Sequence, residues 1–552
     1  MAKYNLIGRQ KEIEELERLY SSNKSEFLAI YGRRRVGKSY LIDEVYGEKM
    51  AFSAVGVYFK KEDRSDLRCR QEQLAHFYES LLQYGMSVET PMPNSWREAF
   101  RLLRQLLENC GKRRKVVFLD ELPWLAGPQS SELIAELGFF WNSWACKQRN
   151  IILVVCGSAT SWMLDNVIRE YGGLYSRLTM KMQLHPFTLG ECEQYYKDRD
   201  FHFSRYEIAL AYMALGGIPY YMDLLRNDRT LAENIDQIFF KNPQIKQEFE
   251  DVYVGLFSSS EKYVDIVVEL GKHKYGMTRK EIADAVHTTS GGGLSTMLDN
   301  LQQSGIITTY PRLGGKRKVM VYQLVDFFSL FYLNYMHKHK TPTTGWGALQ
   351  RSPQFFAWAG LTFEILVSQH IRQLQNALRI GTVTGMYNWR GMTDDGDGSQ
   401  IDLVIEWHGE RTDYLCEIKF SENVFAINAD YKQALLDKIS AFRESAQHIK
   451  SHSILLVMVT TMGVKRNVHS GCVNLEVTLD SCQNLGESAF SGCTLLKNVT
   501  LGCCQIIGAR SFTGCTSLKE ITLPETITNL GWECFDGTTM VTSMATGNLA
   551  TV

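Results

Sequence analysis

Three apolar runs in the first 160 residues have the length of buried β-strands. They are Glu26–Ile30, Lys115–Leu119 and Ile151–Cys156. Short continuous apolar runs bounded by glycine or polar residues are typical of strands covered on both faces. The first run leads through a glycine-rich turn into Tyr40–Val45, which has the pattern of a helix. We therefore expect a strand–loop–helix unit and two further buried strands in this region.

Helical periodicity replaces the strand pattern between residues 190 and 255, where we expect an all-helical segment. The next block predicts three helices followed by two strands. Their bounds are Glu261–Leu270, Arg279–Val286 with Thr278 as its N-cap, Gly292–Ser304, Ile306–Tyr310 and Val319–Leu324. This order is the outline of a winged helix-turn-helix, with residues 311–318 as the wing.

A third pattern follows the polar stretch His337–Ser352. It predicts an amphipathic helix over Gly360–Leu374 and two strands, Ser399–Glu406 and Tyr414–Phe420. We expect a further α/β domain here.

The C-terminal residues repeat. Residues 489–501 (AFSGCTLLKNVTL) align with residues 511–523 (SFTGCTSLKEITL) at a shift of 22, another copy begins at Cys534, and a partial copy occupies residues 470–479. A leucine-rich period of this length is typical of a solenoid in which each turn adds a short strand. The tail resembles BspA-type leucine-rich repeats. Its recurring cysteines, Cys472, Cys493 and Cys515, predict a stacked interior ladder of thiols, and the tail is expected to contact a protein partner.

The turn after the first strand carries the clearest chemistry. Residues 32–39 read GRRRVGKS and fit G-x-x-x-x-G-K-[ST] between a strand and a helix. The glycines let successive backbone N–H groups surround phosphate oxygens, and the helix N-terminus adds partial positive charge. Lys38 is expected to contact the β- and γ-phosphates and the Ser39 hydroxyl to ligate Mg²⁺, with ATP as the ligand. The candidate nucleotide-binding residues of this segment are Gly32, Arg33, Arg34, Arg35, Val36, Gly37, Lys38, Ser39 and Tyr40.

Polar residues end the other two strands. Asp120 is expected to hold the Mg²⁺ shell, and Glu121 to polarise the attacking water. After the third strand, Ser158 and Thr160 both qualify as a sensor of the γ-phosphate, and the sequence does not choose between them. N-capping of the helix that follows is the alternative role for these hydroxyls.

The order of the N-terminal motifs is also informative. Six motifs follow one another along the chain: LIGR (6–9), FLAIYGRRRVGKSYL, VVFLDELPWL, VVCGSATSWM, GGLYSRLT and LGGIPYYM. Together they resemble AAA+ ATPases, and in particular the archaeal-type ATPase family with a C-terminal restriction-endonuclease-like domain, over residues 1–468. The resemblance implies a P-loop AAA+ parallel sheet with a helical lid, ATP hydrolysis, and Gly8 in the box beside the adenine.

Two further assignments come from this resemblance. It makes Arg177, in GGLYSR, a candidate arginine finger for a neighbouring subunit, which implies a homo-oligomer; a surface arginine in a loop is the alternative. It also matches Gly216–Pro219 to a turn of the lid, to which we assign a backbone bend and no chemistry.

The third domain carries a second candidate site. Glu417 and Lys419 lie on one face of their strand, and Asp402 is expected on the neighbouring strand. Two carboxylates and a lysine can hold Mg²⁺ and activate water, with Glu364 completing the metal shell from the helix. SQIDLVI and CEIKF resemble the PD-(D/E)XK nuclease superfamily, with Ile401 in place of the leading proline. The alternatives are a surface hairpin with these residues by chance, and a nuclease-like fold that binds without cleaving.

Residues 311–318 contain four basic residues and no acid, which suits contact with DNA phosphates. The helix that would read bases, 292–304, has no Arg or Lys, so a spacer between two enzymatic domains is the alternative.

Composition limits the kind of nucleic-acid contact and the cellular location that we expect. The chain has 552 residues, 13 cysteines and a formal net charge of −1, so nucleic-acid contact requires a local basic patch. The N-terminus has no apolar core of a signal peptide, and the apolar runs are too short to cross a membrane. We therefore expect a cytoplasmic protein with reduced cysteines and no membrane association.

We expect an α/β multidomain protein with five parts. They are an AAA+ P-loop ATPase core (1–188), a helical lid (189–255), a winged helix (256–336), a PD-(D/E)XK nuclease-like domain (345–468) and a leucine-rich-repeat tail (469–552). The expected function is ATP hydrolysis coupled to a DNA-binding, metal-dependent nuclease-like domain. The alternative is an ATP-dependent regulatory switch in which the nuclease-like domain is non-catalytic and the tail recruits a protein.

Overall fold

The structure is a computed structural model. It describes residues 6–59, 66–127, 130–168, 174, 177–241, 243–256, 260–289, 291–314, 317–337, 345–350, 352–378, 380, 385–392, 398–445 and 451–480, together with short segments at 506–507, 511–513, 515–523, 529–530, 534–535 and 540–543. The chain folds as two compact units. The first unit comprises Met1–His202, Ala214–Thr309 and Tyr322–Leu349, and the second comprises Phe203–Met213, Tyr310–Val321 and Gln350–Val552.

The first unit is built on a parallel sheet of five strands. The strands are β1 (Glu26–Tyr31), β2 (Met50–Val55), β3 (Lys115–Asp120), β4 (Ile151–Gly157) and β5 (Met180–Gln183). Their order is β2-β3-β4-β1-β5, and every neighbouring pair is parallel. The three strands predicted from apolar runs, β1, β3 and β4, are confirmed.

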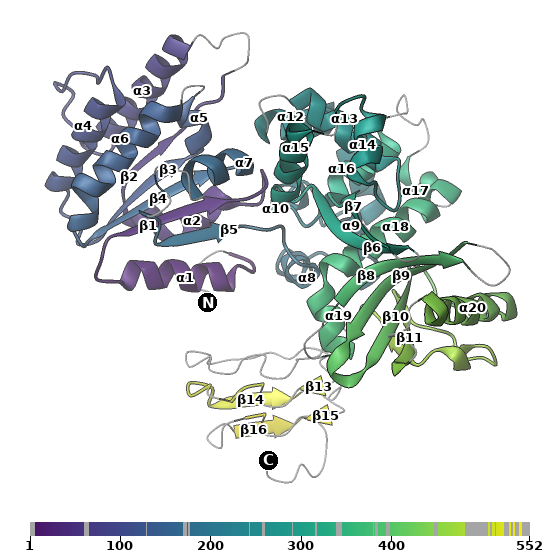
Figure 1. The fold of residues 1–552 in the computed structure, drawn as a ribbon. Helices are drawn as coiled ribbons and strands as arrows, with labels where there is room; N and C mark the ends of the chain where they lie inside the picture. Colours follow the sequence, from purple (N-terminus) through teal and green to yellow (C-terminus); the bar gives the residue numbers. More distant parts are fainter. Residues whose placement is uncertain are drawn as a thin grey trace. The chain divides into compact units, whose positions relative to one another are not determined.

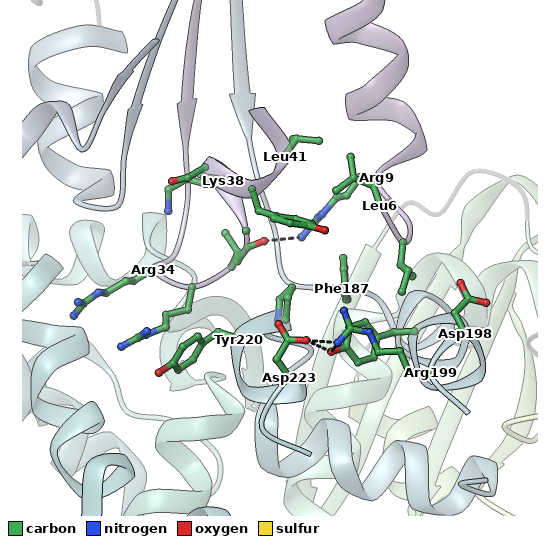
Figure 2. Close-up of a pocket in the computed structure, with 18 of the residues that line it drawn as sticks. Leu6, Arg9, Arg34, Lys38, Leu41, Phe187, Asp198, Arg199, Tyr220 and Asp223 are labelled. Atoms are coloured by element: carbon green, nitrogen blue, oxygen red, sulfur yellow. Dashed lines mark hydrogen bonds and ion pairs between the residues drawn. The ribbon is translucent and has the colours of Figure 1, made fainter. Parts of the chain in front are cut away.

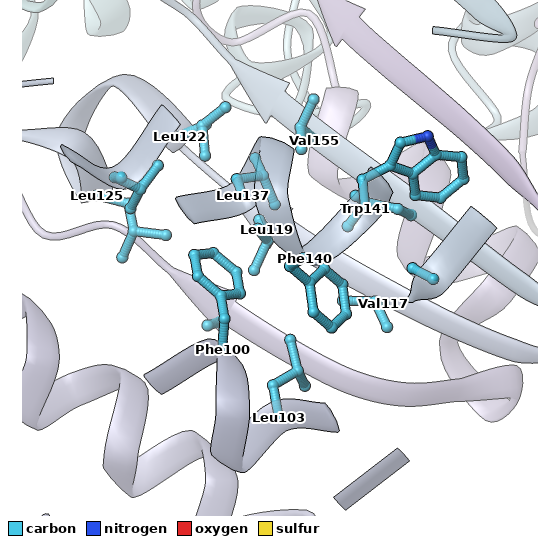
Figure 3. Close-up of a cluster of buried hydrophobic side chains, with 14 of the residues drawn as sticks. Phe100, Leu103, Val117, Leu119, Leu122, Leu125, Leu137, Phe140, Trp141 and Val155 are labelled. Atoms are coloured by element: carbon cyan, nitrogen blue, oxygen red, sulfur yellow. The ribbon is translucent and has the colours of Figure 1, made fainter. Parts of the chain in front are cut away.

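Helices cover both faces of this sheet. They are α1 (Gln10–Ser21), α2 (Lys38–Tyr46), α3 (Asp66–Gln83), α4 (Trp96–Asn109), α5 (Leu122–Ala126) and α6 (Ser130–Ser143). Figure 1 shows α3, α4 and α6 on one side of the sheet and α1 on the other. On the α3–α6 side, Phe100, Leu119, Phe140 and Val155 belong to one buried apolar cluster, drawn in Figure 3. Burial of large apolar side chains stabilises such a layer by about 1.5–3 kcal/mol each, so this cluster holds the helices on this side against the sheet.

The rest of the first unit is mainly helical, as predicted. Its helices are α7 (Thr160–Met163), α8 (Leu189–Asp198), α9 (Arg205–Leu215, shared with the second unit), α10 (Pro219–Met222), α11 (Leu231–Ile235), α12 (Pro243–Leu256), α13 (Ser260–Gly271), α14 (Arg279–Ala285), α15 (Gly292–Gln303), α16 (Phe327–Tyr335) and α17 (Trp346–Leu349). Thr278 caps α14 in a capping box with Glu281, so the predicted start of this helix is confirmed.

The hairpin after α15 differs from the prediction. Strands β6 (Ile307–Gly314) and β7 (Arg317–Leu324) extend through most of residues 311–318, where we expected a wing loop. The reason is strand pairing, because Arg312–Gly314 of β6 run parallel to residues 388–390 of β8 (Gly385–Met392). Backbone groups expected to be free in a loop therefore take part in a sheet ladder.

The second unit contains a mixed sheet in the order β12-β11-β10-β9-β8-β6-β7. Its other strands are β9 (Gly398–Trp407), β10 (Thr412–Lys419), β11 (Ser453–Thr460) and β12 (Leu475–Val477), and its helices are α18 (Pro353–Gln369), α19 (Ile371–Leu378) and α20 (Ala429–Ser445). Strands β8–β11 lie side by side in Figure 1. The predicted strands β9 and β10 are confirmed. The predicted helix over Gly360–Leu374 is wrong in its bounds, because Ser352 caps a helix that starts at Pro353 and ends at Gln369.

The described part of the repeat tail shows parallel ladders about one repeat apart. Strand β14 (Glu520–Leu523) pairs in parallel with β16 (Met540–Ser543), and β13 (Ile506–Ile507) with β15 (Asn529–Leu530). Cys515 and Cys534 are buried, and the nine cysteines within the described residues are free thiols. Cys493 lies outside the described residues.

Within the described residues, no helix has both the length and the apolar character that a membrane span requires.

Candidate functional site

The loop between β1 and α2 has a backbone shape that depends on glycine. Gly32 has φ 143°, and a Cβ there would lie 2.2 Å from the carbonyl oxygen of Leu184. Gly37 has φ 89° and precedes the first turn of α2. Lys38 is 6% exposed, and its ammonium group donates hydrogen bonds to the carbonyl oxygens of Gly32 (3.1 Å) and Arg33 (2.9 Å). The loop therefore curls around the lysine side chain.

Substitution of Gly32 by alanine is expected to destabilise the fold by about 1–3 kcal/mol, because the new Cβ meets backbone and the residue keeps a positive φ. Denaturant unfolding measures the change. Gly190→Ala is the matched control, because nothing lies within 4 Å of a Cβ at Gly190. Equal stability of Gly32→Ala and wild type would contradict this description of the loop.

The end of β3 lies directly beside the loop. The Ser39 hydroxyl donates a 2.6 Å hydrogen bond to Asp120 Oδ2, and Asp120 Oδ1 accepts the backbone N–H of Glu121 at 2.9 Å. Asp120 is 7% exposed. A hydroxyl and a carboxylate in contact are hard oxygen ligands of the kind that Mg²⁺ prefers. The residues present therefore fit a magnesium ion at this point.

Glu121 takes a left-handed backbone conformation, with φ 46°, at the N-cap of α5. Its Oε2 accepts hydrogen bonds from the backbone N–H of Ser158 (3.1 Å) and from the Ser158 hydroxyl (2.9 Å). Burial raises the pKa of Glu121, and the nearby charge of Lys38 works in the opposite direction. The chain thus brings the ends of β3 and β4 together at this carboxylate.

The N-capping alternative for Ser158 and Thr160 is wrong. The N-cap of α7 is Ala159, which makes no side-chain cap. The Thr160 hydroxyl instead donates a 3.4 Å hydrogen bond to the Ser158 carbonyl. The sensor role of Ser158 stays a prediction.

A cavity of about 740 Å³ opens beside the loop. Its lining includes the loop and α2 residues Arg34, Arg35, Val36, Gly37, Lys38, Ser39, Tyr40 and Leu41, and also Leu6, Ile7, Arg9, Glu121, Trp124, Phe187, Tyr195, Asp198, Arg199, Pro219, Tyr220 and Asp223. Figure 2 shows Lys38 and Arg34 toward one end of the cavity and Leu6, Phe187 and Arg199 toward the other. One end is therefore basic and next to the loop, and the other combines apolar and aromatic surface with the charged side chains of Arg9, Asp198, Arg199 and Asp223. The volume is typical of a small-molecule site.

Several lining residues were not found from the sequence. Arg199 lies 4.2 Å from the ring centroid of Tyr195, and both side chains donate hydrogen bonds to Asp223. Pro219 ends the turn Gly216–Pro219, to which we assign only a bend, and Tyr220 follows it. The adjacent aromatic residues Tyr220 and Tyr221, directly after that turn, are the sequence feature that could have indicated a binding role.

Two N-terminal candidates remain, Gly8 and Arg177, and neither is among the residues that line the cavity. Gly8 has φ 64°, and a Cβ there would lie 2.5 Å from Glu191 Oε1. Its neighbour Arg9 lines the cavity, lies over the Phe187 ring at 4.7 Å and donates to the Val36 carbonyl at 3.2 Å. Arg177 is exposed and is not among the residues that line this cavity, so its assignment as a finger stays a prediction.

The side chains of Arg33, Arg34 and Arg35 take three directions. Arg33 pairs with Asp326, Arg35 pairs with Glu248, and the Arg34 guanidinium lies 6.0 Å from the Trp124 ring centroid. The two ion pairs connect the loop to α12 and to the start of α16.

The second unit brings together the other predicted residues. Lys419 contacts Glu417 Oε1 at 2.8 Å, and the neighbouring Asp402 accepts the backbone N–H of Ile418 at 2.9 Å. Glu364 lies on α18, which packs against β10. Burial would lower the pKa of Lys419, but the charges of Glu417, Asp402 and Glu364 outweigh it and raise the pKa. Asp402 and Glu417 are 8% and 3% exposed. The four predicted residues thus share one region of the second unit.

Two residues of this cluster were missed. Lys438 donates to Glu417 Oε2 at 2.8 Å, and the Tyr431 hydroxyl donates to Glu417 Oε1 at 2.8 Å. Burial would raise the pKa of Glu417, but the charges of Lys419 and Lys438 outweigh it and lower the pKa. Burial and the charge of Glu417 raise the pKa of Asp402. Both missed residues come from α20, which carries no motif.

The described residues contain no group of three or more His, Cys, Asp or Glu side chains arranged to hold a metal ion. Glu364, Asp402 and Glu417 therefore do not form such a group, and a metal ion at the predicted site would have Asp402 and Glu417 as its carboxylate ligands, with water or substrate oxygens as the others. Mg²⁺ commonly keeps several waters and binds through one or two carboxylates, so the two acids fit it.

Comparison with known proteins shows what the N-terminal and C-terminal parts of the chain resemble. Residues 6–225 match the family described as an ATPase domain predominantly from Archaea, and residues 440–552 match the BspA-type leucine-rich repeat region. With its parallel five-stranded sheet and phosphate loop, the N-terminal part of this chain is a nucleotide-binding P-loop ATPase. The match to the ATPase domain found predominantly in Archaea covers 220 of the 552 residues, so this similarity concerns the N-terminal part of the chain.

Individual relatives are distant over most of the chain. An uncharacterized protein of Methanocaldococcus jannaschii is 23% identical over 353 residues, which cover 60% of this chain and 68% of the relative. An uncharacterized ATP-binding protein of the same organism is 44% identical over 43 residues, 8% of this chain and 73% of the relative. Among solved structures, the Walker-type ATPase paby2304 of Pyrococcus abyssi is 21% identical, with a TM-score of 0.44 over 60% of this chain and 96% of that one.

Proposed function

We propose that this chain binds ATP in the 740 Å³ cavity and hydrolyses it with residues from the ends of β1, β3 and β4. The observation that carries the proposal is the 2.6 Å hydrogen bond between Ser39 and Asp120, because it joins the phosphate loop to the acidic strand end. Lys38 and the loop N–H groups would bind the phosphates, and Leu6, Phe187 and Tyr220 would cover the apolar base.

In the proposed reaction, metal binding, activation of water and the contact with a neighbouring subunit are carried out by different residues. Ser39 and Asp120 would hold Mg²⁺, which when bound polarises phosphoryl oxygens. Glu121 would orient the attacking water and accept its proton, with Ser158 fixing the carboxylate by two hydrogen bonds. Arg177 would act on a neighbouring subunit of a homo-oligomer.

A second activity is favoured by the cluster in the second unit. Asp402 and Glu417 would hold Mg²⁺, Glu364 would add negative charge near Lys419, and Lys419 would orient water or offset charge on a DNA phosphate. The buried carboxylates beside two lysines support a PD-(D/E)XK nuclease-like site. The winged-helix segment would contact DNA, and the repeat tail would bind a protein partner.

The division of the chain is part of this proposal. We propose an ATPase core (1–188), a helical lid (189–255), a winged helix (256–336), a nuclease-like domain (345–468) and a repeat tail (469–552).

The experiment measures ATP turnover and DNA cleavage by the full chain with Mg²⁺ or Mn²⁺, with and without ATP. Lys38→Ala is expected to lower ATP turnover by about 10²–10³-fold, because it removes a charged donor to the phosphates. Unchanged turnover in Lys38→Ala would refute the ATP site. DNA cleavage that requires Asp402 supports the nuclease, whereas no cleavage by wild type supports the non-catalytic alternative.

A further inference from the structure

Two carboxylates outside the ATPase core hold the phosphate loop by its arginines. Glu248 on α12 faces Arg35, with Nε–Oε1 at 2.8 Å and Nη2–Oε2 at 2.7 Å. Two parallel N–H···O hydrogen bonds of this kind fix the orientation of both side chains. Glu248 is 5% exposed and also accepts the Tyr221 hydroxyl at 3.1 Å. Its carboxylate is therefore rigidly placed.

The backbone conformation of Arg35 requires contacts that hold the residue in place. Its φ is 74°, a left-handed conformation that is uncommon for a residue with a Cβ and persists where the surroundings impose it. The guanidinium also lies 3.7 Å from the ring centroid of Tyr220, which lines the cavity. The ion pair with Glu248 and the stacking on Tyr220 hold Arg35 at the middle of the loop.

Arg33 is anchored in the same way but more deeply. It is 4% exposed, and its Nη2 lies 2.9 Å and 3.0 Å from the two oxygens of Asp326. Asp326 is itself fixed, because it is the N-cap of α16 and accepts the backbone N–H of Ser329 at 2.9 Å. The two ends of the arginine run are thus tied to two different helices.

We propose that Glu248 and Asp326 are positioning residues for ATP binding: they hold Arg35 and Arg33 so that the loop keeps its N–H groups directed at the phosphates. This inference rests on the proposed function, since it assumes that ATP occupies the loop. It also makes ATP affinity depend on how α12 and α16 pack, so the helical part of the unit can regulate the ATPase through these two contacts.

The test is a double-mutant cycle of Arg35→Ala, Glu248→Gln and both together, with the dissociation constant of ATP measured by titration. Each single change is expected to weaken ATP binding roughly tenfold, and the double variant is expected to be no weaker than the worse single one, because both remove the same anchor. Asp228→Asn is the matched control. It removes a carboxylate from a similar but exposed pair with Arg226 (3.0 and 2.7 Å) and should leave ATP binding unchanged.

Unchanged ATP affinity in Glu248→Gln, or single effects that multiply in the double variant, would overturn the inference, even if the melting temperature falls. Asp326→Asn keeps a helix cap but removes the charge facing Arg33, and it should weaken ATP binding in the same direction. If that variant does not fold, the Arg35–Glu248 cycle still decides. Lys38→Ala is titrated alongside: a wild type that binds no ATP, or binds it independently of Lys38, refutes the proposed function itself.

Discussion

Substitution of Glu121 by glutamine is expected to abolish most ATP turnover while ATP still binds. Glutamine keeps the size of the side chain and can still accept the hydrogen bonds of Ser158, but it cannot take a proton from water. General-base catalysis contributes about 10²–10⁴-fold, so turnover should fall by that factor with little change in the dissociation constant of ATP. A steady-state turnover assay and an equilibrium titration on the same preparation separate the two effects.

Glu108→Gln provides the control for this change, because Glu108 is exposed on α4 and pairs with Arg104 of the same helix. It should hydrolyse ATP at the wild-type rate. Turnover of Glu121→Gln within threefold of Glu108→Gln would assign the base to another group.

Asp402→Asn is expected to have the largest effect in the second unit. Asparagine fills the same space and can still accept the Ile418 N–H, but it removes half of the carboxylate pair that would hold Mg²⁺. Loss of a metal ligand should lower DNA cleavage by about 10²-fold or more, since metal ions contribute several kcal/mol to such reactions. ATP turnover should not change.

The half-buried Asp437, which accepts a hydrogen bond from Gln433 on the same helix, offers a matched control as Asp437→Asn. Titration with Mn²⁺ gives a second readout that does not depend on cleavage, and Asp402→Asn should bind Mn²⁺ more weakly than Asp437→Asn does. Equal Mn²⁺ affinity and equal cleavage in the two variants would contradict a metal site at Asp402.

The sequence was most informative where chemistry and secondary structure are local. The apolar runs of β1, β3 and β4 end at the loop, at Asp120 and at Ser158, because each strand is buried along its length and the polar residues begin at the sheet edge. The contact between Ser39 and Asp120 then follows from two strands that end at the same edge of a parallel sheet.

Residues that depend on distant packing could not be predicted. Phe187, Arg199 and Asp223 line the cavity only because α8 and α10 fold back toward the loop, and no spacing in the sequence encodes that approach. Lys438 was missed for the same reason, since it reaches Glu417 from a helix 21 positions along the chain. The wing was misjudged because its pairing partner, β8, lies about 75 residues further on.

Equilibrium titration of the full chain with ATP, without turnover, tests the central claim most directly. Wild type and Lys272→Ala, which alters an exposed lysine paired with Glu269 on α13, should each bind one ATP per chain with equal affinity. Lys38→Ala should bind ATP at least about tenfold more weakly, because its ammonium group lies inside the loop. Equal affinity in all three proteins, or no binding in any, would contradict an ATP site at residues 32–39.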